Sequence, residues 1–171
     1  MRFVTGDFSR LSAVVSTQAK QWRDTGTDTL LDVTSPDNIA ISGWLANGAV
    51  ASSHVGHIPF AGSGYRMEIY GREGTLVASG EDSPQLGEVV LHGAKRDNKL
   101  ASLPVPERFT LASPGTPSGE AANVGQMYAL FVQAIRDGKG QRPDFATAVE
   151  LHRLVDAIKQ ASDVGREVTT A

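Results

Sequence analysis

Residues 38–58, NIAISGWLANGAVASSHVGHI, decide the fold of this chain. Asn47-Gly48 lies between two runs of β-forming residues, and both residues tolerate the positive φ of a type I′ turn. We therefore predict a β-hairpin whose register pairs Leu45 with Val50 and Ile41 with His54. In that register one face carries Ile39, Ile41, Leu45, Val50 and His54, and the other carries Ala40, Trp44, Ala51, Val55 and His57. Because both faces are largely apolar, we expect the hairpin to be covered on both sides.

Further strands flank this hairpin in the sequence. Alternation of apolar residues predicts a strand over Leu11–Thr17, whereas the polar residues 18–30 indicate a loop. YRMEIYGREGTLVAS, residues 65–79, predicts a second hairpin with its turn bracketed by two glycines. A third strand pair is expected from Val89–Leu91 and Leu100–Leu103, joined through the polar residues 95–99, and residues 104–119 read as a long loop.

The last third of the chain is helical by its spacing. Apolar residues recur at helical intervals in residues 124–135, and Gly138 lies where such a helix ends. Asp144 is a good N-cap for a second helix, which ends before Gly165, and Glu167–Thr170 is expected to add a short strand. Strands first and helices last predict an α+β fold, a largely antiparallel open mixed sheet with helices on one face, as a single domain over residues 1–171.

Composition excludes several classes of function. The 171 residues carry 16 basic and 19 acidic side chains, with no basic run, so a nucleic-acid partner is not expected. The absence of cysteine rules out disulfides, thiolate metal sites and a cysteine nucleophile. No apolar stretch is long enough to span a membrane and the N-terminus does not read as a signal peptide, so we expect a cytoplasmic protein without a membrane partner.

No catalytic centre is evident from the residues. The glycines of GSGYRMEIYG, from Gly62, are neither preceded by an apolar strand nor followed by a helix, as a phosphate-binding loop would be. His54 and His57 are three residues apart on a strand and point to opposite faces, so they are not expected to share a metal ion. There is no G-x-S-x-G elbow. We therefore predict no catalytic, metal or cofactor-binding residue.

Three segments resemble the C-terminal domain of the Gfo/Idh/MocA family of NAD(P)-dependent oxidoreductases. LLDVTSPDNIAISGWLANGAVASSHVG is similar to its central hairpin, and MEIYGREGTLVAS to its I-x-G-x-x-G-x-L hairpin. ALFVQAIRDGKGQRPDFATAVELHRLVDAIKQASDVGREV resembles its terminal signature, F-x-x-A-I-x-x-G followed by P-D-F and A-I-x-x-S-x-x-x-G-x-x-V. Together the segments cover roughly residues 30–170, and MRFVTGDF resembles the end of the helix that leads into the domain.

The resemblance implies partners that this sequence does not itself encode. Family members carry an N-terminal Rossmann domain that holds NAD or NADP and the lysine of an E-K-P motif. Their usual aspartate and histidine lie on the helix that here would sit immediately before Met1. None of these positions occurs here, so no catalytic residue is carried over. The resemblance also implies a homo-oligomer formed through the sheet face, with a sugar or polyol ligand at one edge of the sheet.

Four residues are the candidates for substrate binding, because the segment from His54 to Arg66 leaves one strand and enters the next. They are His54, His57, Tyr65 and Arg66, whose donors and acceptors suit a polyhydroxylated ligand. The alternative is packing: His54 beside Ile41, His57 near Trp44, and Arg66 paired with Glu68.

Three readings of the whole chain stay open. The first is the non-catalytic substrate-side part of such an oxidoreductase, truncated or cleaved from its parent. The second is a free-standing binding or assembly module that works with a separate nucleotide-binding chain. The third is a small independent sugar-processing enzyme that uses His54 or His57 with Arg66.

Overall fold

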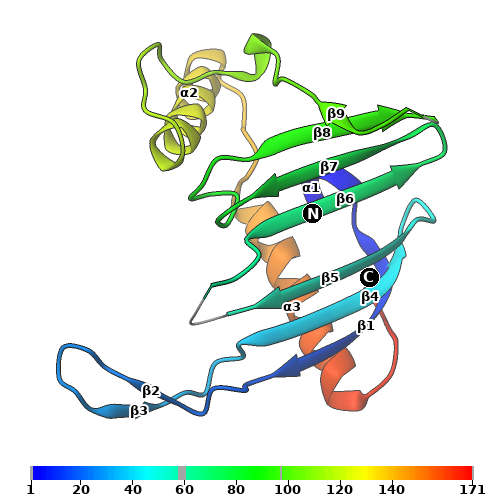
Figure 1. Cartoon of the computed structure of the whole chain (residues 1–171), viewed down its shortest axis with the longest axis vertical. Coiled ribbons are helices and arrows are strands. Elements are labelled where there is room, and N and C mark those ends of the chain that lie inside the picture. The colour runs from blue at the N-terminus through cyan, green and yellow to red at the C-terminus, as the bar shows by residue number, and fades with distance from the viewer. Residues whose placement is uncertain (1, 58–60, 97, 171) are drawn as a thin grey trace. The chain divides into compact units, whose positions relative to one another are not determined.

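The computed structural model of the chain describes residues 2–57, 61–96 and 98–170. By their contacts the residues divide into two compact units, one formed by Met1–Pro59 with Pro143–Ala171 and the other by Phe60–Arg142. Antiparallel strands and helices make up both units (Figure 1), which confirms the predicted α+β class and largely antiparallel pairing. That the two units form a single domain stays a prediction. No helix among the described residues has the length and apolar character needed to cross a membrane.

The first unit is built on a sheet with strand order β10-β1-β4-β5. Its strands are β1 (Phe8–Ser16), β4 (Asn38–Leu45), β5 (Val50–Gly56) and β10 (Val168–Thr169). A separate two-stranded ribbon pairs β2 (Gln21–Arg23) with β3 (Leu30–Asp32). The helices are the short α1 (Arg2–Thr5) and the long α3 (Phe145–Val164). The strand expected at the C-terminus is thus present as β10, paired with β1.

The core of this unit lies between α3 and one face of the sheet, as Figure 1 shows. Phe8, Leu11 and Leu45 from the strands pack with Ala161 from α3, and Leu11 is completely excluded from solvent. The small Ala161 lets α3 approach β1, where the Ser162 hydroxyl accepts a hydrogen bond of 2.9 Å from the backbone N–H of Val15. The helix therefore covers one face of the sheet only.

The central hairpin forms as predicted, but its register differs by one residue. The observed pairs include Trp44 with Val50 and Ala40 with His54, in place of Leu45 with Val50 and Ile41 with His54. The loop has three residues: the Leu45 carbonyl accepts from Gly48 N–H at 2.9 Å, and Leu45 N–H donates to the Ala49 carbonyl at 2.8 Å. Gly48 has a φ of 86°, the left-handed glycine of a bulged three-residue loop rather than part of a type I′ turn.

This shift redistributes the side chains between the two faces. Val50 and His54 share a face with Trp44 rather than with Ile41 and Leu45, so the predicted composition of the faces was wrong. Leu45 and Ile41 lie on the helix side together with the small Ala51. A small residue at that position leaves room for α3, which explains why the longer loop is preferred.

Residues 18–30, predicted as a loop, contain β2 and the first residue of β3. All six residues of these strands are exposed, so the apolar alternation that marks a half-buried strand is missing. The base of the ribbon is held by the Asp37 carboxylate, which accepts from the backbone N–H groups of Gln18 at 2.7 Å and Ala19 at 2.6 Å. These hydrogen bonds, with one from the Asn38 amide, lower the pKa of Asp37 to about 2.

The second unit contains a sheet with strand order β6-β7-β8-β9. Its elements are β6 (Tyr65–Gly71), β7 (Gly74–Gly80), β8 (Val90–Lys95), β9 (Ala101–Ser102), the 3-10 turn η1 (Glu107–Phe109) and the helix α2 (Glu120–Asp137). The second hairpin and the third strand pair are both confirmed, with Tyr65 opposite Gly80 and Gly93 opposite Ala101. Of the polar connection 95–99, Asp97 lies outside the described residues.

Both long helices end where their sequences predict. Gly138 follows α2 in the left-handed conformation, with a φ of 60°, and Gly165 follows α3 in the same conformation, with a φ of 66°. The Asp144 carboxylate accepts a 2.7 Å hydrogen bond from the backbone N–H of Thr147, which is the predicted N-cap of α3.

Candidate functional site

His54 lies on β5, on the face of the sheet that α3 does not cover. Its partner across the ladder is Ala40, and the side chain is exposed. The expected packing of His54 beside Ile41 was wrong, because the three-residue turn moves His54 to the opposite face. Its imidazole remains open to a ligand or a partner on that side.

His57 follows β5 and lies against the ribbon of β2 and β3. Its ring centroid is 4.8 Å from that of Trp22, with the planes inclined by 32°, and its backbone N–H donates to the Asp37 carbonyl at 2.7 Å. The expected neighbour was Trp44, which was wrong. Trp22 lies in the segment 18–30 that was predicted to be a loop, so no strand pattern in the sequence pointed to this contact.

Tyr65 and Arg66 begin β6, in the other unit. The Arg66 guanidinium pairs with the Glu68 carboxylate, with Nε to Oε1 at 2.7 Å, so the predicted ion pair is confirmed. The Tyr70 hydroxyl donates to the second oxygen of Glu68 at 2.6 Å. Hydrogen bonds from Tyr70 and then Arg66 lower the pKa of Glu68, and the carboxylate in turn raises the pKa of Tyr70.

The four candidates therefore form two pairs, with His54 and His57 in one unit and Tyr65 and Arg66 in the other. A common ligand for all four stays a prediction. Within the described ranges, residues 2–57, 61–96 and 98–170, no three His, Asp or Glu side chains gather closely enough to hold a metal ion.

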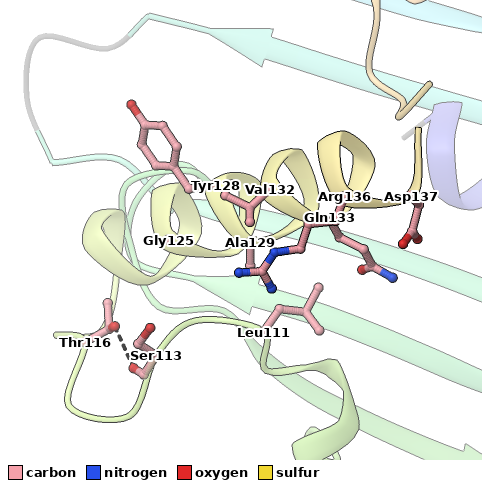
Figure 2. Close-up of a pocket in the computed structure, with 10 residues that line it drawn as sticks. All are labelled: Leu111, Ser113, Thr116, Gly125, Tyr128, Ala129, Val132, Gln133, Arg136 and Asp137. Atoms are coloured by element: carbon pink, nitrogen blue, oxygen red, sulfur yellow. Dashed lines mark hydrogen bonds between the residues drawn. The ribbon is translucent and has the colours of Figure 1, made fainter. Parts of the chain in front are cut away.

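A hollow of about 680 Å³ lies within the second unit, beside α2 (Figure 2). Its apolar wall comes from Leu111, Ala129 and Val132, and its polar groups include Arg136, Gln133 and Tyr128. Figure 2 shows the Arg136 side chain projecting from α2 toward Leu111. The volume is in the range of ligand pockets, but the wall is open and most of its residues are exposed.

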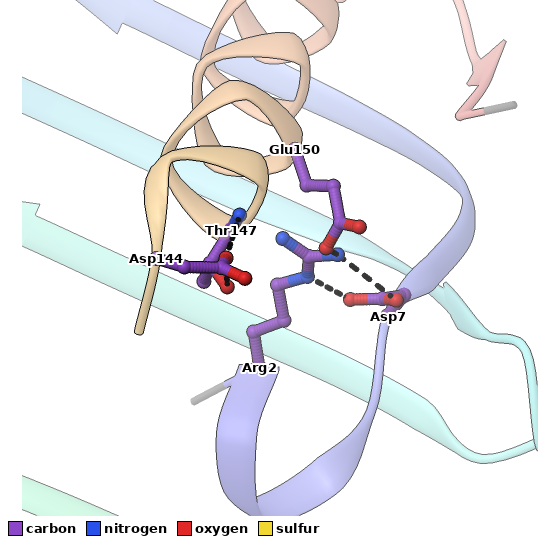
Figure 3. Close-up of polar contacts among 5 residues, drawn as sticks. All are labelled: Arg2, Asp7, Asp144, Thr147 and Glu150. Carbon is purple, nitrogen blue, oxygen red and sulfur yellow. Dashed lines mark hydrogen bonds and ion pairs between the residues drawn. The ribbon is translucent and has the colours of Figure 1, made fainter. Parts of the chain in front are cut away.

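An ion cluster at the N-terminus joins α1 to α3 in the first unit (Figure 3). The Arg2 guanidinium pairs with Asp7, and its Nη2 donates to Glu150 at 2.9 Å. The hydrogen bond from Arg2 lowers the pKa of Asp7. These groups border a hollow of about 500 Å³ that also touches Arg153 and Gln160. Because Arg2 and Glu150 are far apart in the chain, no local pattern marks the cluster; it fastens the start of the chain to α3.

The surface with the most distinctive composition is the uncovered face of the sheet in the first unit, here called the open face. Strand alternation and the observed register assign to it Arg10, Ser12, Val14, Ala40, Ser42, Trp44, Val50, Ser52 and His54. Ser12, Ser42 and Ser52 form a row of small residues across three strands. Val14, Trp44 and Val50 are 65%, 41% and 70% exposed.

The Trp44 side chain of the open face is held in position by Arg10. The Arg10 guanidinium carbon lies 5.2 Å from the centroid of a Trp44 ring, a cation–π arrangement, and Nη1 pairs with Glu167 at 3.1 Å. The indole is thereby oriented on the surface while part of it remains open to solvent. A partly apolar face of this kind is typical of protein–protein contacts.

The chain belongs to the Gfo/Idh/MocA oxidoreductase family: the model of the C-terminal alpha/beta domain matches residues 1–170. No curated protein matches the sequence. Among solved structures, levoglucosan dehydrogenase in complex with NADH and levoglucosan is similar, at 21% identity and a TM-score of 0.79 over 99% of this chain and 46% of that one.

Two further structures resemble the chain. An oxidoreductase domain protein from Kribbella flavida is 20% identical, with a TM-score of 0.77 over 99% of this chain and 48% of that one. The transcriptional regulator Gal80p from Kluyveromyces lactis is 20% identical, with a TM-score of 0.75 over 99% of this chain and 44% of that one. At these identities the likeness shows the fold. This chain spans less than half the length of each of these structures.

Proposed function

We propose that this chain is the substrate-side and oligomerisation domain of an NAD(P)-dependent oxidoreductase that acts on a sugar or polyol, and that it is not catalytic in isolation. The observation that carries the proposal is the open face. In this family domain, α3 covers only one side of the sheet of the first unit. The other side exposes the large apolar side chains Val14, Trp44 and Val50. Such a face is stabilised by a partner, and a second copy related by a two-fold axis is the simplest one.

The open face has the features that sheet-to-sheet association requires. The serine row in its middle allows two backbones to approach closely, and Trp44 supplies the aromatic anchor that protein interfaces favour. The polar side chains of the open face lie among its apolar side chains, so two copies in contact could form hydrogen bonds as well as bury apolar surface. We expect the association to be lost when a charge is placed at Val50.

For the substrate, the proposal names His54, His57, Tyr65 and Arg66. Each carries a group that hydrogen-bonds hydroxyls, and levoglucosan, an anhydrosugar, is bound by one of the similar enzymes. Arg66 is already paired with Glu68, so a hydroxyl ligand would meet a carboxylate–guanidinium pair rather than a free cation.

The cofactor requirement gives the test of this function. Calorimetric titration of the isolated chain with NADH and NADPH is expected to show no saturable heat at millimolar ligand, because the nucleotide-binding half supplies that site in this family. A micromolar dissociation constant for either nucleotide would contradict the proposal.

In an enzyme rebuilt with a nucleotide-binding half before Met1, alanine at each of the four candidates is expected to raise KM for the polyol. Unaltered kcat and KM in all four variants would show that these residues have packing roles only and do not bind the substrate.

A second function is favoured by one finding: the transcriptional regulator Gal80p shares this fold. A fold does not fix an activity, and a binding or assembly module is built on the same framework. The rebuilt enzyme separates the two. Turnover of NAD(P) with a polyol supports the oxidoreductase, whereas binding of NAD(P) without turnover on any tested polyol supports the binding module.

A further inference from the structure

Asp37 lies between β3 and β4 and joins three segments of the first unit. Its carboxylate accepts from the backbone N–H of Gln18 through Oδ1 at 2.7 Å and from that of Ala19 through Oδ2 at 2.6 Å. Its own backbone N–H donates to the Ser16 carbonyl at 3.0 Å, and its carbonyl accepts from the backbone N–H of His57 at 2.7 Å. One residue therefore fixes the end of β1, the segment that leads into the ribbon of β2 and β3, and the chain directly after β5.

The ionised form of the Asp37 side chain suits this arrangement, because each of its two oxygens accepts from a backbone donor. Hydrogen bonds from N–H groups to a carboxylate are stronger than those between neutral groups. Asp37→Asn leaves a single acceptor oxygen and turns an NH2 group toward one of the two N–H donors. This substitution should therefore loosen the base of the ribbon while it leaves the volume of the side chain almost unchanged.

The ribbon of β2 and β3 continues from the ends of β1 and β4 (Figure 1) and carries Trp22, whose ring stacks on the imidazole of His57. All six residues of its strands are exposed, and a two-stranded hairpin is only marginally stable by itself. The position of Trp22 thus depends on how the ribbon is anchored. At its base the Val33 N–H donates to the Lys20 carbonyl at 2.8 Å, directly beside the segment that Asp37 holds. The contacts run from the Asp37 carboxylate through the ribbon to the indole and the imidazole.

We propose that Asp37 and Trp22 are positioning residues for His57, the carboxylate by fixing the ribbon and the indole by fixing the orientation of the imidazole. This rests on the proposed function, in which His57 is a candidate for binding the sugar or polyol. An exposed side chain that is already held in one rotamer loses less entropy when it binds a ligand. Because the Asp37 carbonyl also holds the backbone of His57, both its main chain and its ring are fixed. All three residues belong to the segment Met1–Pro59, so the arrangement lies within one unit.

The positions of the His57 imidazole resonances in the proton NMR spectrum of the chain test this geometry. The sequence has four histidines, and His57→Gln identifies the resonances of this one. An aromatic ring at 4.8 Å displaces the resonances of its neighbour, so Trp22→Leu is expected to move them to the positions of a solvated histidine. Asp37→Asn is expected to move them in the same direction by at least half as much. All spectra are recorded at the same neutral pH without urea.

Asp24→Asn is the matched control. The Asp24 carboxylate also accepts from a backbone N–H, that of Gly26 at 2.7 Å, but it does so in the turn of the ribbon rather than at its base. It is expected to leave the His57 resonances in place. Resonances that stay in place in Trp22→Leu or in Asp37→Asn would overturn the role of that residue. A displacement in the control as large as that in Asp37→Asn would overturn the assignment to Asp37.

The role in substrate binding is tested in the rebuilt enzyme, with levoglucosan as the probe. Trp22→Leu is expected to raise KM by about three- to tenfold, with kcat changed less than twofold, and to have no further effect when His57→Ala is already present. Additive effects of the two substitutions would show that Trp22 acts independently of His57 and would overturn the positioning role. If His57→Ala keeps the KM of the parent, the proposed function is wrong at this residue and the positioning role fails with it. If His57→Ala raises KM and Trp22→Leu does not, only the positioning role is overturned.

Discussion

Replacing Leu11 by alanine tests which face of β1 is buried. The Leu11 side chain has no exposed surface and packs with Phe8, Leu45 and Ala161. The substitution removes three carbon atoms from the core. At about 0.8 kcal/mol for each, with a further contribution from the cavity, the free energy of unfolding should fall by about 3–4 kcal/mol. For a unit of this size that corresponds to a lowering of Tm by about 15 °C or more.

The assay is urea unfolding followed by tryptophan fluorescence. The sequence has two tryptophans, Trp22 and Trp44, and both lie in the first unit, so the signal reports on that unit alone. The matched control is Val14→Ala, on the same strand but on the open face, expected to cost less than about 1 kcal/mol at submicromolar protein. If Leu11→Ala costs less than about 1 kcal/mol, or if Val14→Ala costs as much as Leu11→Ala, the assignment of the two faces is wrong.

Two further substitutions test local structure. Asp37→Asn should lower the urea midpoint at neutral pH. The reason is that the native pKa of Asp37 is about 2, below its ordinary value of 3.8, so the ionised carboxylate stabilises the fold above about pH 4. That difference between parent and variant should shrink as the pH falls from 3.8 toward 2, and a difference independent of pH would show that the carboxylate charge is not the cause. Asp144→Ala should cost about 1 kcal/mol through the lost N-cap of α3, measured by the same unfolding assay, and an unchanged midpoint would show that the cap contributes nothing.

Much of the fold follows from local sequence signals. The N-cap Asp144 and the glycines at 138 and 165 each act on the backbone of their own helix, so their effect is visible in the sequence. The strand pairs β6–β7 and β8–β9 likewise follow from alternation and turn residues. The family was also identified from the order of its motifs, which the match over residues 1–170 confirms.

The register of the central hairpin could not be predicted from the local sequence, because it depends on contacts with a distant part of the chain. Asn47-Gly48 is compatible with a two-residue turn and with a three-residue loop, and the two differ by one residue in register. The choice follows from α3, which comes about a hundred residues later in the sequence and whose packing favours Leu45 and the small Ala51 on its side. The stack of Trp22 on His57 and the pair of Arg2 with Glu150 were missed for the same reason.

The candidate substrate residues were chosen by residue type and by their place between two strands. The structure adds that His54 is on the open face and that Arg66 is paired with Glu68. The orientation of α2 was not predicted from the sequence: the periodicity indicated an apolar side, but the hydrogen bond of Gln126 with Leu111 shows which side of the helix faces its own unit.

The most direct test of the proposed function is the mass of the chain in solution at micromolar concentration, measured by sedimentation equilibrium. The parent chain is expected to be a dimer or larger, and Val50→Asp, which places a charge on the open face, is expected to be a monomer. Tyr70→Asp, a substitution of an exposed residue on β6 in the other unit, is the control and should keep the mass of the parent. A monomeric parent, or a Val50→Asp variant with the mass of the parent, would contradict association through the open face.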